Sequence, residues 1–110
     1  MNWLVVLAAL SGALAVGAGA FGAHGASGAA AEWLRTGAQY QLVHAVAALV
    51  AAQMGARGAG WLFVAGGAVF AGTLYLMALG LPRWLGAVTP IGGLALIAGW
   101  VWLAWGGVRG

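Results

Sequence analysis

Long apolar stretches with almost no charge constrain this chain more than any other feature. Only 5% of its 110 residues are Asp, Glu, Lys or Arg, whereas 65% are hydrophobic. A soluble domain has about 25% charged residues, so a water-soluble fold is excluded. Each helical crossing of a bilayer takes about 20 apolar residues, so four crossings leave no room for a second domain. We therefore predict an all-α fold in which residues 1–110 form a single domain, an integral membrane four-helix bundle.

The predicted helices follow the breaks between apolar runs. Glycines are dense in the segment Gly55–Gly60, which predicts a tight turn, and Pro82 marks the end of another run. The last helix could begin at Trp84, but Thr89 as a cap with Pro90 at the first helical position favours the later start. We expect helices at about residues 3–22, 38–56, 60–81 and 89–106.

Two features near the first apolar run need interpretation. Ala18-Gly19-Ala20 is similar to a signal-peptide cleavage site, but no Lys or Arg precedes the run, so we expect a retained helix. The polar segment that follows contains Ser27, a suitable helix cap, with Glu32 and Arg35 one turn apart. We predict a short interfacial helix here, between the first and second crossings.

Hydrogen-bonding side chains gather on one side of the membrane if the four helices alternate in direction. In the second predicted helix, Tyr40 and His44 are four residues apart and share a side, and His44 would lie one to two turns inside the membrane. The opposite leaflet would contain only Asn2, Ser11 and Gln53 as hydrogen-bonding side chains. The candidate polar site consists of His24, Tyr40, Gln41, His44, Thr73, Tyr75, Thr89 and Pro90.

Several short motifs together resemble a known family. They are Gly19-Ala-Phe-Gly-Ala-His-Gly25, Tyr40-Gln41 with His44, Phe70-Ala-Gly-Thr-Leu-Tyr75, and Thr89-Pro-Ile-Gly-Gly-Leu94 with Gly99-Trp100. In this order they resemble the domain of unknown function 423 family, to which animal transmembrane protein 256 is related. The resemblance implies a small multi-pass protein of the bacterial plasma (inner) membrane with four crossings. It implies no reaction, ligand or partner.

The polar residues suggest three functions. Ionisable groups inside membranes are often functional, so a site for a small solute, ion or lipid is the first hypothesis; the same residues could instead only hold the helices together. The alternative is a non-catalytic membrane assembly or accessory subunit. The second alternative is haem or metal binding through His24 and His44. Because no carboxylate or thiol is close to these histidines to complete a metal shell, we predict no cofactor.

Charge and reactive groups limit the remaining classes. Glu32 is the only carboxylate side chain and the chain has no Lys or Cys, so we do not expect an enzyme. The four arginines are scattered, which argues against nucleic acid as a partner. Membrane lipid is the expected partner, and small residues four apart could also support a homo-oligomer after packing the chain's own helices. The arginines divide evenly between the two sides, and the N-terminal amine alone favours cytoplasmic termini.

Overall fold

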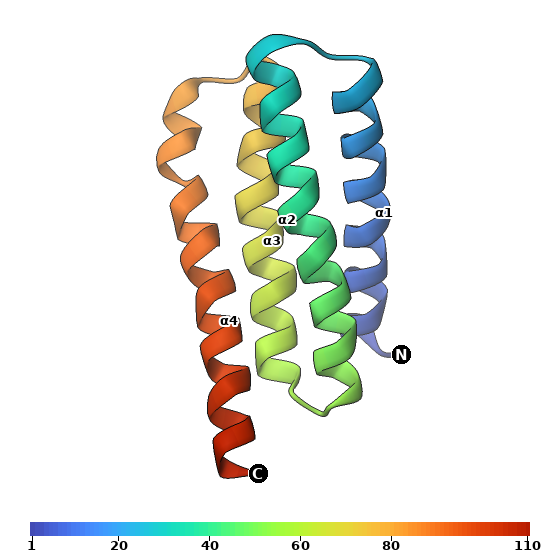
Figure 1. Ribbon diagram of the computed structural model, residues 1–110, viewed down its shortest axis with the longest axis vertical. Helices are drawn as coiled ribbons and strands as arrows, with labels where there is room; N and C mark the ends of the chain where they lie inside the picture. Colours follow the sequence, from blue (N-terminus) through green and yellow to red (C-terminus); the bar gives the residue numbers. More distant parts are fainter.

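Four long antiparallel helices make up the protein in a computed structural model that describes residues 1–110 (Figure 1). Both termini lie at the same end of the molecule (Figure 1). The all-helical prediction is therefore confirmed. The helices are α1 (Trp3–His24), α2 (Gly28–Gln53), α3 (Arg57–Ala78) and α4 (Thr89–Arg109), with a short 3-10 helix, η1 (Arg83–Ala87), before α4.

The start of α4 agrees with the later of the two predicted positions. α4 begins at Thr89, and Val88 rather than Thr89 occupies the cap position. Pro90 lies in the first turn, where a helix needs no N–H donor. Trp84, the other predicted start, lies in the separate η1 turn.

The predicted short helix between the first two crossings is not a separate element. Residues 28–53 form one continuous helix, so α2 begins at Gly28 instead of near residue 38. The predicted second helix begins just after Gly37, but Gly37 is buried inside α2, and a Cβ atom there would lie 2.7 Å from Cε1 of Tyr75. Gly37 therefore allows close helix packing and does not end a helix.

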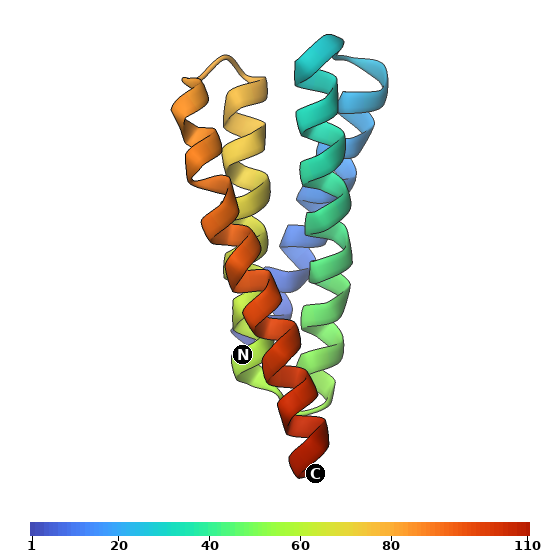
Figure 2. The ribbon, with the colours of Figure 1, turned by 60° about the vertical axis from the view of Figure 1, so that its left-hand side comes forward.

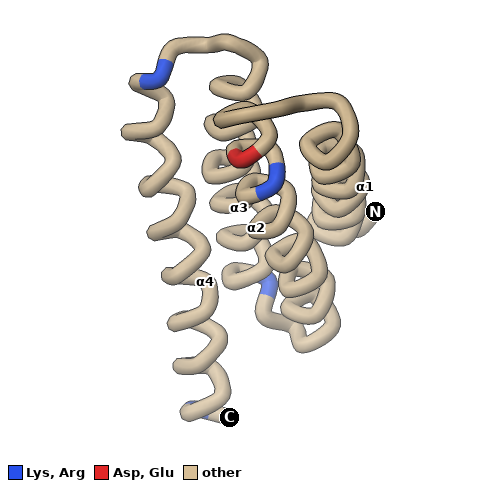
Figure 3. The backbone as a smooth tube through the Cα atoms, turned by 45° about the horizontal axis from the view of Figure 1, so that its top comes forward, with Lys and Arg blue, Asp and Glu red and all other residues tan.

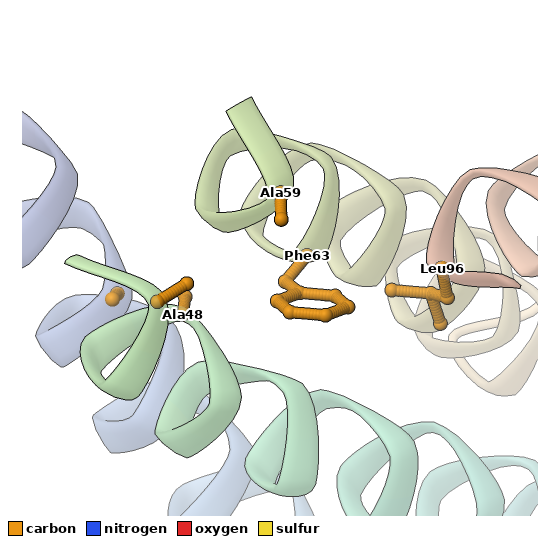
Figure 4. Close-up of a cluster of buried hydrophobic side chains, with 6 residues drawn as sticks. Ala48, Ala59, Phe63 and Leu96 are labelled. Atoms are coloured by element: carbon orange, nitrogen blue, oxygen red, sulfur yellow. The ribbon is translucent and has the colours of Figure 1, made fainter. Parts of the chain in front are cut away.

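Small residues let the helices approach one another closely. α2 packs against both α1 and α3, and α4 packs on α3 at the side away from α1 (Figure 2). Phe63 of α3 fills the space between helices and is 1% exposed. Figure 4 shows this side chain pointing between Ala48 of α2 and Leu96 of α4. The buried cluster consists of Ala8, Ala48, Ala51, Ala59, Phe63 and Leu96.

The contact between α1 and α2 sets the depth of each α2 residue. A Cβ atom on Gly12 would lie 3.7 Å from Cβ of Ala45, and one on Gly19 would lie 3.4 Å from Cβ of Ala38. Because the two helices are antiparallel, a step of one residue forward along α1 corresponds in level to a step of one residue backward along α2. The midpoint of α1 therefore lies opposite His44.

Charged residues lie toward the two ends of the helices and leave their middle uncharged (Figure 3). At one end, Arg35 donates to Glu32 over 3.0 Å, and the Arg83 guanidinium lies 5.6 Å from the centre of the Trp33 ring. At the other end, Arg57 donates to the Asn2 side chain over 3.3 Å. Three segments are long and apolar enough to cross a membrane, namely Trp3–His24, Arg57–Ala78 and Arg83–Arg109.

Candidate functional site

The predicted polar residues do not form one site. Six of them belong to three hydrogen-bonded groups that lie at different helix contacts, and two lie outside these groups. Each group joins two or three of the helices.

The first group joins three helices through Gln41, which is 3% exposed on α2. Its Nε2 donates to the Ser11 hydroxyl of α1 over 3.1 Å. Its Oε1 accepts a 2.7 Å hydrogen bond from the Tyr75 hydroxyl of α3. Both ends of the amide are therefore used in holding α1, α2 and α3 together.

The second group joins α3 to α4 through two buried threonines. The hydroxyls of Thr73 and Thr89 lie 2.6 Å apart. The Thr73 hydroxyl also lies 2.9 Å from the backbone oxygen of Val69 and 3.1 Å from that of Phe70, and the Thr89 hydroxyl lies 3.4 Å from the backbone oxygen of Leu85. These threonines satisfy their own hydroxyls within the two helices and leave none free for a ligand.

The third group joins α2 to α4 and fixes the protonation of His44. Trp100 Nε1 donates to His44 Nε2 over 3.0 Å. Because an indole nitrogen can only donate, Nε2 must be the unprotonated nitrogen. His44 Nδ1 lies 2.6 Å from the backbone oxygen of Tyr40, so it carries the hydrogen and donates it. This arrangement requires a neutral imidazole whose two nitrogens are both occupied.

His24 and Pro90 lie outside these groups. His24 is the last residue of α1 and is exposed, and Pro90 is exposed in the first turn of α4. His44 lies 16 residues after the start of α2, which corresponds to about 24 Å along the helix. The structure therefore does not bring His24 and His44 together, and the hypothesis that this pair ligates one haem or metal is not supported by their positions.

The earlier start of α2 also changes the depth of the polar residues. His44 was predicted one to two turns inside the membrane, but it lies opposite the midpoint of α1. Ser11 was assigned to the opposite leaflet, yet it bonds directly to Gln41. The polar groups therefore extend from one end of the molecule to its middle, where Gln41 meets Ser11.

A groove of about 460 Å³ lies beside His44, between α2 and α4, with α3 behind it. Aromatic rings form much of its wall. The Tyr40 and Phe70 ring centres are 4.7 Å apart, and the His44 and Trp100 ring centres are 5.9 Å apart. The groove is lined by Tyr40, His44, Phe70, Gly93, Leu96, Ile97 and Trp100.

Sequence reasoning missed the place of Trp100 in this groove. Trp100 is not among the site residues predicted from the sequence. It lies eleven residues after Thr89, which is about 16 Å into α4. This depth is too great for an interfacial residue. The spacing between Thr89 and Trp100 in the sequence could have shown this depth once the start of α4 was known.

Another cavity, of about 480 Å³, lies at the end that holds both termini. The turn after α2 and the last turns of α4 surround it, including Gly55, Gly107 and Gly110. It contains none of the candidate polar residues. We place the candidate site in the groove beside His44, because that groove adjoins a hydrogen-bonded histidine at the middle of the molecule.

Comparisons with known proteins agree with the resemblance noted in the sequence. A family model described as "Protein of unknown function (DUF423)" matches residues 18–93. The chain is 38% identical to the UPF0382 membrane protein YwdK of Bacillus subtilis, over 99% of this chain and 98% of the relative. It is 40% identical to the UPF0382 inner membrane protein YgdD of Escherichia coli K12, over 98% of this chain and 91% of the relative. No solved structure matches the chain.

Proposed function

Because this chain belongs to the DUF423 family and is a multi-pass protein of the inner membrane, we propose that it binds a membrane-soluble small molecule in the groove between α2 and α4. The proposal includes four crossings of the bilayer, one by each long helix. The observation that carries it is the aromatic groove beside His44, at the depth of the midpoint of α1.

The path of the chain supports a fourth crossing. α1 and α3 are both long and apolar enough to cross, and α2 connects the end of one to the start of the other. α2 has 26 residues, or about 39 Å, against a hydrocarbon thickness of about 30 Å. Gln41 and His44 would be costly in lipid, but both are buried and hydrogen-bonded.

The character of the groove favours an apolar ligand that enters from the lipid. The volume of about 460 Å³ lies in the range of small-molecule sites, which is about 300–1,000 Å³. Its rings and aliphatic side chains offer apolar contact, and both nitrogens of His44 are already bonded within the protein. At the depth of the bilayer centre, the molecules that can reach the groove are those dissolved in the membrane.

The three hydrogen-bonded groups favour a structural role over conduction. A pathway for protons or ions needs polar groups that follow one another across the membrane. Here the groups at Gln41, Thr73 and His44 lie at separate helix contacts, and no buried side-chain donor or acceptor is left without a partner. We assign them to holding the helices together, and we assign binding to the groove.

The binding proposal is tested by filling the groove. Gly93 lines it, and a Cβ atom there would meet only the Phe70 ring at 3.8 Å, so Gly93→Leu places a side chain in the groove without a backbone clash. Gly72→Leu is the matched control, because nothing lies within 4 Å of its Cβ position and it is outside the groove. Native mass spectrometry of detergent-purified protein should show a bound molecule in the unchanged protein and in the control only. Equal retention by all three proteins would contradict the proposal.

The four crossings are tested separately with single cysteines, since the chain has none of its own. Cysteines at Ser27 and Leu81 should react with a membrane-impermeant maleimide from one side of the membrane. Cysteines at Met54 and Gly110 should react from the other side. Labelling of Ser27→Cys and Met54→Cys from the same side would show that α2 does not cross.

A further inference from the structure

Two polar side chains beside the groove make no hydrogen bond within the protein, and they point to the kind of ligand. They are the Gln39 amide and the Tyr40 hydroxyl, both on exposed residues of α2. We propose that the ligand carries a flat, uncharged head with carbonyl oxygens, the chemistry of an isoprenoid quinone, and that these two side chains bind it. This inference rests on the proposed binding function of the groove.

The site has an apolar part and a more polar part. A cavity of about 210 Å³, lined by Gln39, Tyr40, Val43 and His44, adjoins the groove of about 460 Å³. Tyr40 and His44 line both. A molecule with a long apolar tail in the groove would therefore place its head beside Gln39 and Tyr40.

The depth of Gln39 makes an unpartnered amide costly. Gln39 precedes His44 by five residues, so its backbone lies about 7 Å from the level of the α1 midpoint. The hydrocarbon extends about 15 Å on each side of the bilayer centre. No water is available there, and an exposed amide facing lipid tails loses its hydrogen bonds. A ligand with carbonyl oxygens would accept hydrogen bonds from the amide Nε2 and from the Tyr40 hydroxyl.

The absence of charge along both cavities selects an uncharged head. Neither cavity is lined by Arg, Lys, Asp or Glu. Both ring nitrogens of His44 are already bonded, to Trp100 and to the Tyr40 backbone. A phosphate head at this depth would have no counter-charge, which excludes ordinary phospholipid heads. The Tyr40 ring, in contact with Phe70 and parallel to His44 within 4°, offers a face on which a flat head can stack.

The test compares a quinone with a matched molecule that lacks carbonyl oxygens. Decyl-substituted benzoquinone and dodecylbenzene are titrated into the purified protein in nanodiscs by isothermal calorimetry. The test variant is Gln39→Leu with Tyr40→Phe, and the control is Gln53→Leu, an exposed glutamine at the far end of α2. We expect the quinone to bind the unchanged protein and the control equally, and to bind the double variant about tenfold more weakly, as for the loss of two hydrogen bonds. Dodecylbenzene should bind all three proteins alike.

Three results would overturn the inference, and they are distinguishable from failure of the groove itself. If the double variant binds the quinone as well as the unchanged protein does, the two side chains do not bind the head, although the groove proposal stands. If dioctanoylglycerol displaces the quinone at equal concentration, the site does not distinguish a flat head from a flexible one. If neither probe binds and Gly93→Leu releases no bound molecule, the inference and the groove proposal both fail.

Discussion

A single methyl group at Gly92 should separate α4 from α3. A Cβ atom there would lie 2.4 Å from the backbone nitrogen of Phe70 and 2.8 Å from the backbone oxygen of Gly66. Ordinary contacts of a Cβ atom begin near 3.4 Å. The atoms in the way belong to the backbone of α3 and cannot rotate aside, so α4 would have to move outward by about 1 Å at this point.

The cost of this movement follows from what it disrupts. Overpacking costs about 1–3 kcal/mol, and we expect the upper end because the 2.6 Å contact between Thr73 and Thr89 lies one turn away and would be stretched. Alanine is favoured over glycine inside a helix by up to about 1 kcal/mol, which partly offsets the loss. We therefore expect Gly92→Ala to lower the free energy of unfolding by about 2 kcal/mol.

The neighbouring glycine provides the control. A Cβ atom on Gly93 would lie 3.8 Å from Cδ2 of Phe70, an ordinary contact, so Gly93→Ala should raise the free energy of unfolding by up to about 1 kcal/mol. Both variants are unfolded by increasing SDS in mixed micelles, with tryptophan fluorescence as the readout. The reasoning is refuted if Gly92→Ala and Gly93→Ala unfold at the same SDS fraction.

The same SDS assay checks three further predictions. Gln41→Leu should lower the free energy of unfolding by about 1–3 kcal/mol, because it leaves the half-buried Tyr75 hydroxyl without its partner; an unchanged midpoint would contradict the bond. Thr73→Val should cost about 1 kcal/mol and Thr73→Ser much less, since serine keeps the hydroxyl; equal costs would show that the hydroxyl is not what matters. Replacing His44 and Trp100 by Phe, singly and together, should give a coupling of about 0.6–1.7 kcal/mol, and additive effects would rule out the bond between them.

Local signals in the sequence identified most of the helix limits. Pro90 gave the start of α4 because its missing N–H is tolerated only in a first helical turn. The glycines around residue 55 gave the turn between α2 and α3, where Gly55 adopts a φ of 77° that other residues rarely adopt. These signals depend only on neighbouring residues, so they can be read without knowledge of the fold.

The start of α2 could not be read in this way. Gly37 breaks helices in water, where its flexibility is costly, but in this protein it is buried opposite Tyr75, 38 residues further along the chain. The same difficulty affects the pairing of Ser11 with Gln41, which depends on how Gly12 and Gly19 fit against alanines of α2. Contacts between distant residues decide both features, and a helix-by-helix interpretation does not include them.

The hydrogen bonds on α2 separate residues that stabilise the fold from residues available to a ligand. Gln41 and His44 are buried, and their polar atoms all have partners in other helices or in the α2 backbone. Gln39 and Tyr40 lie on the same helix, at nearly the same depth, with side-chain polar atoms that have no partner. If the four residues were only structural, replacing any of them would lower stability. We instead expect the Gln39 and Tyr40 changes to leave stability nearly unchanged while they weaken binding, because apolar replacements are favourable where the protein faces lipid.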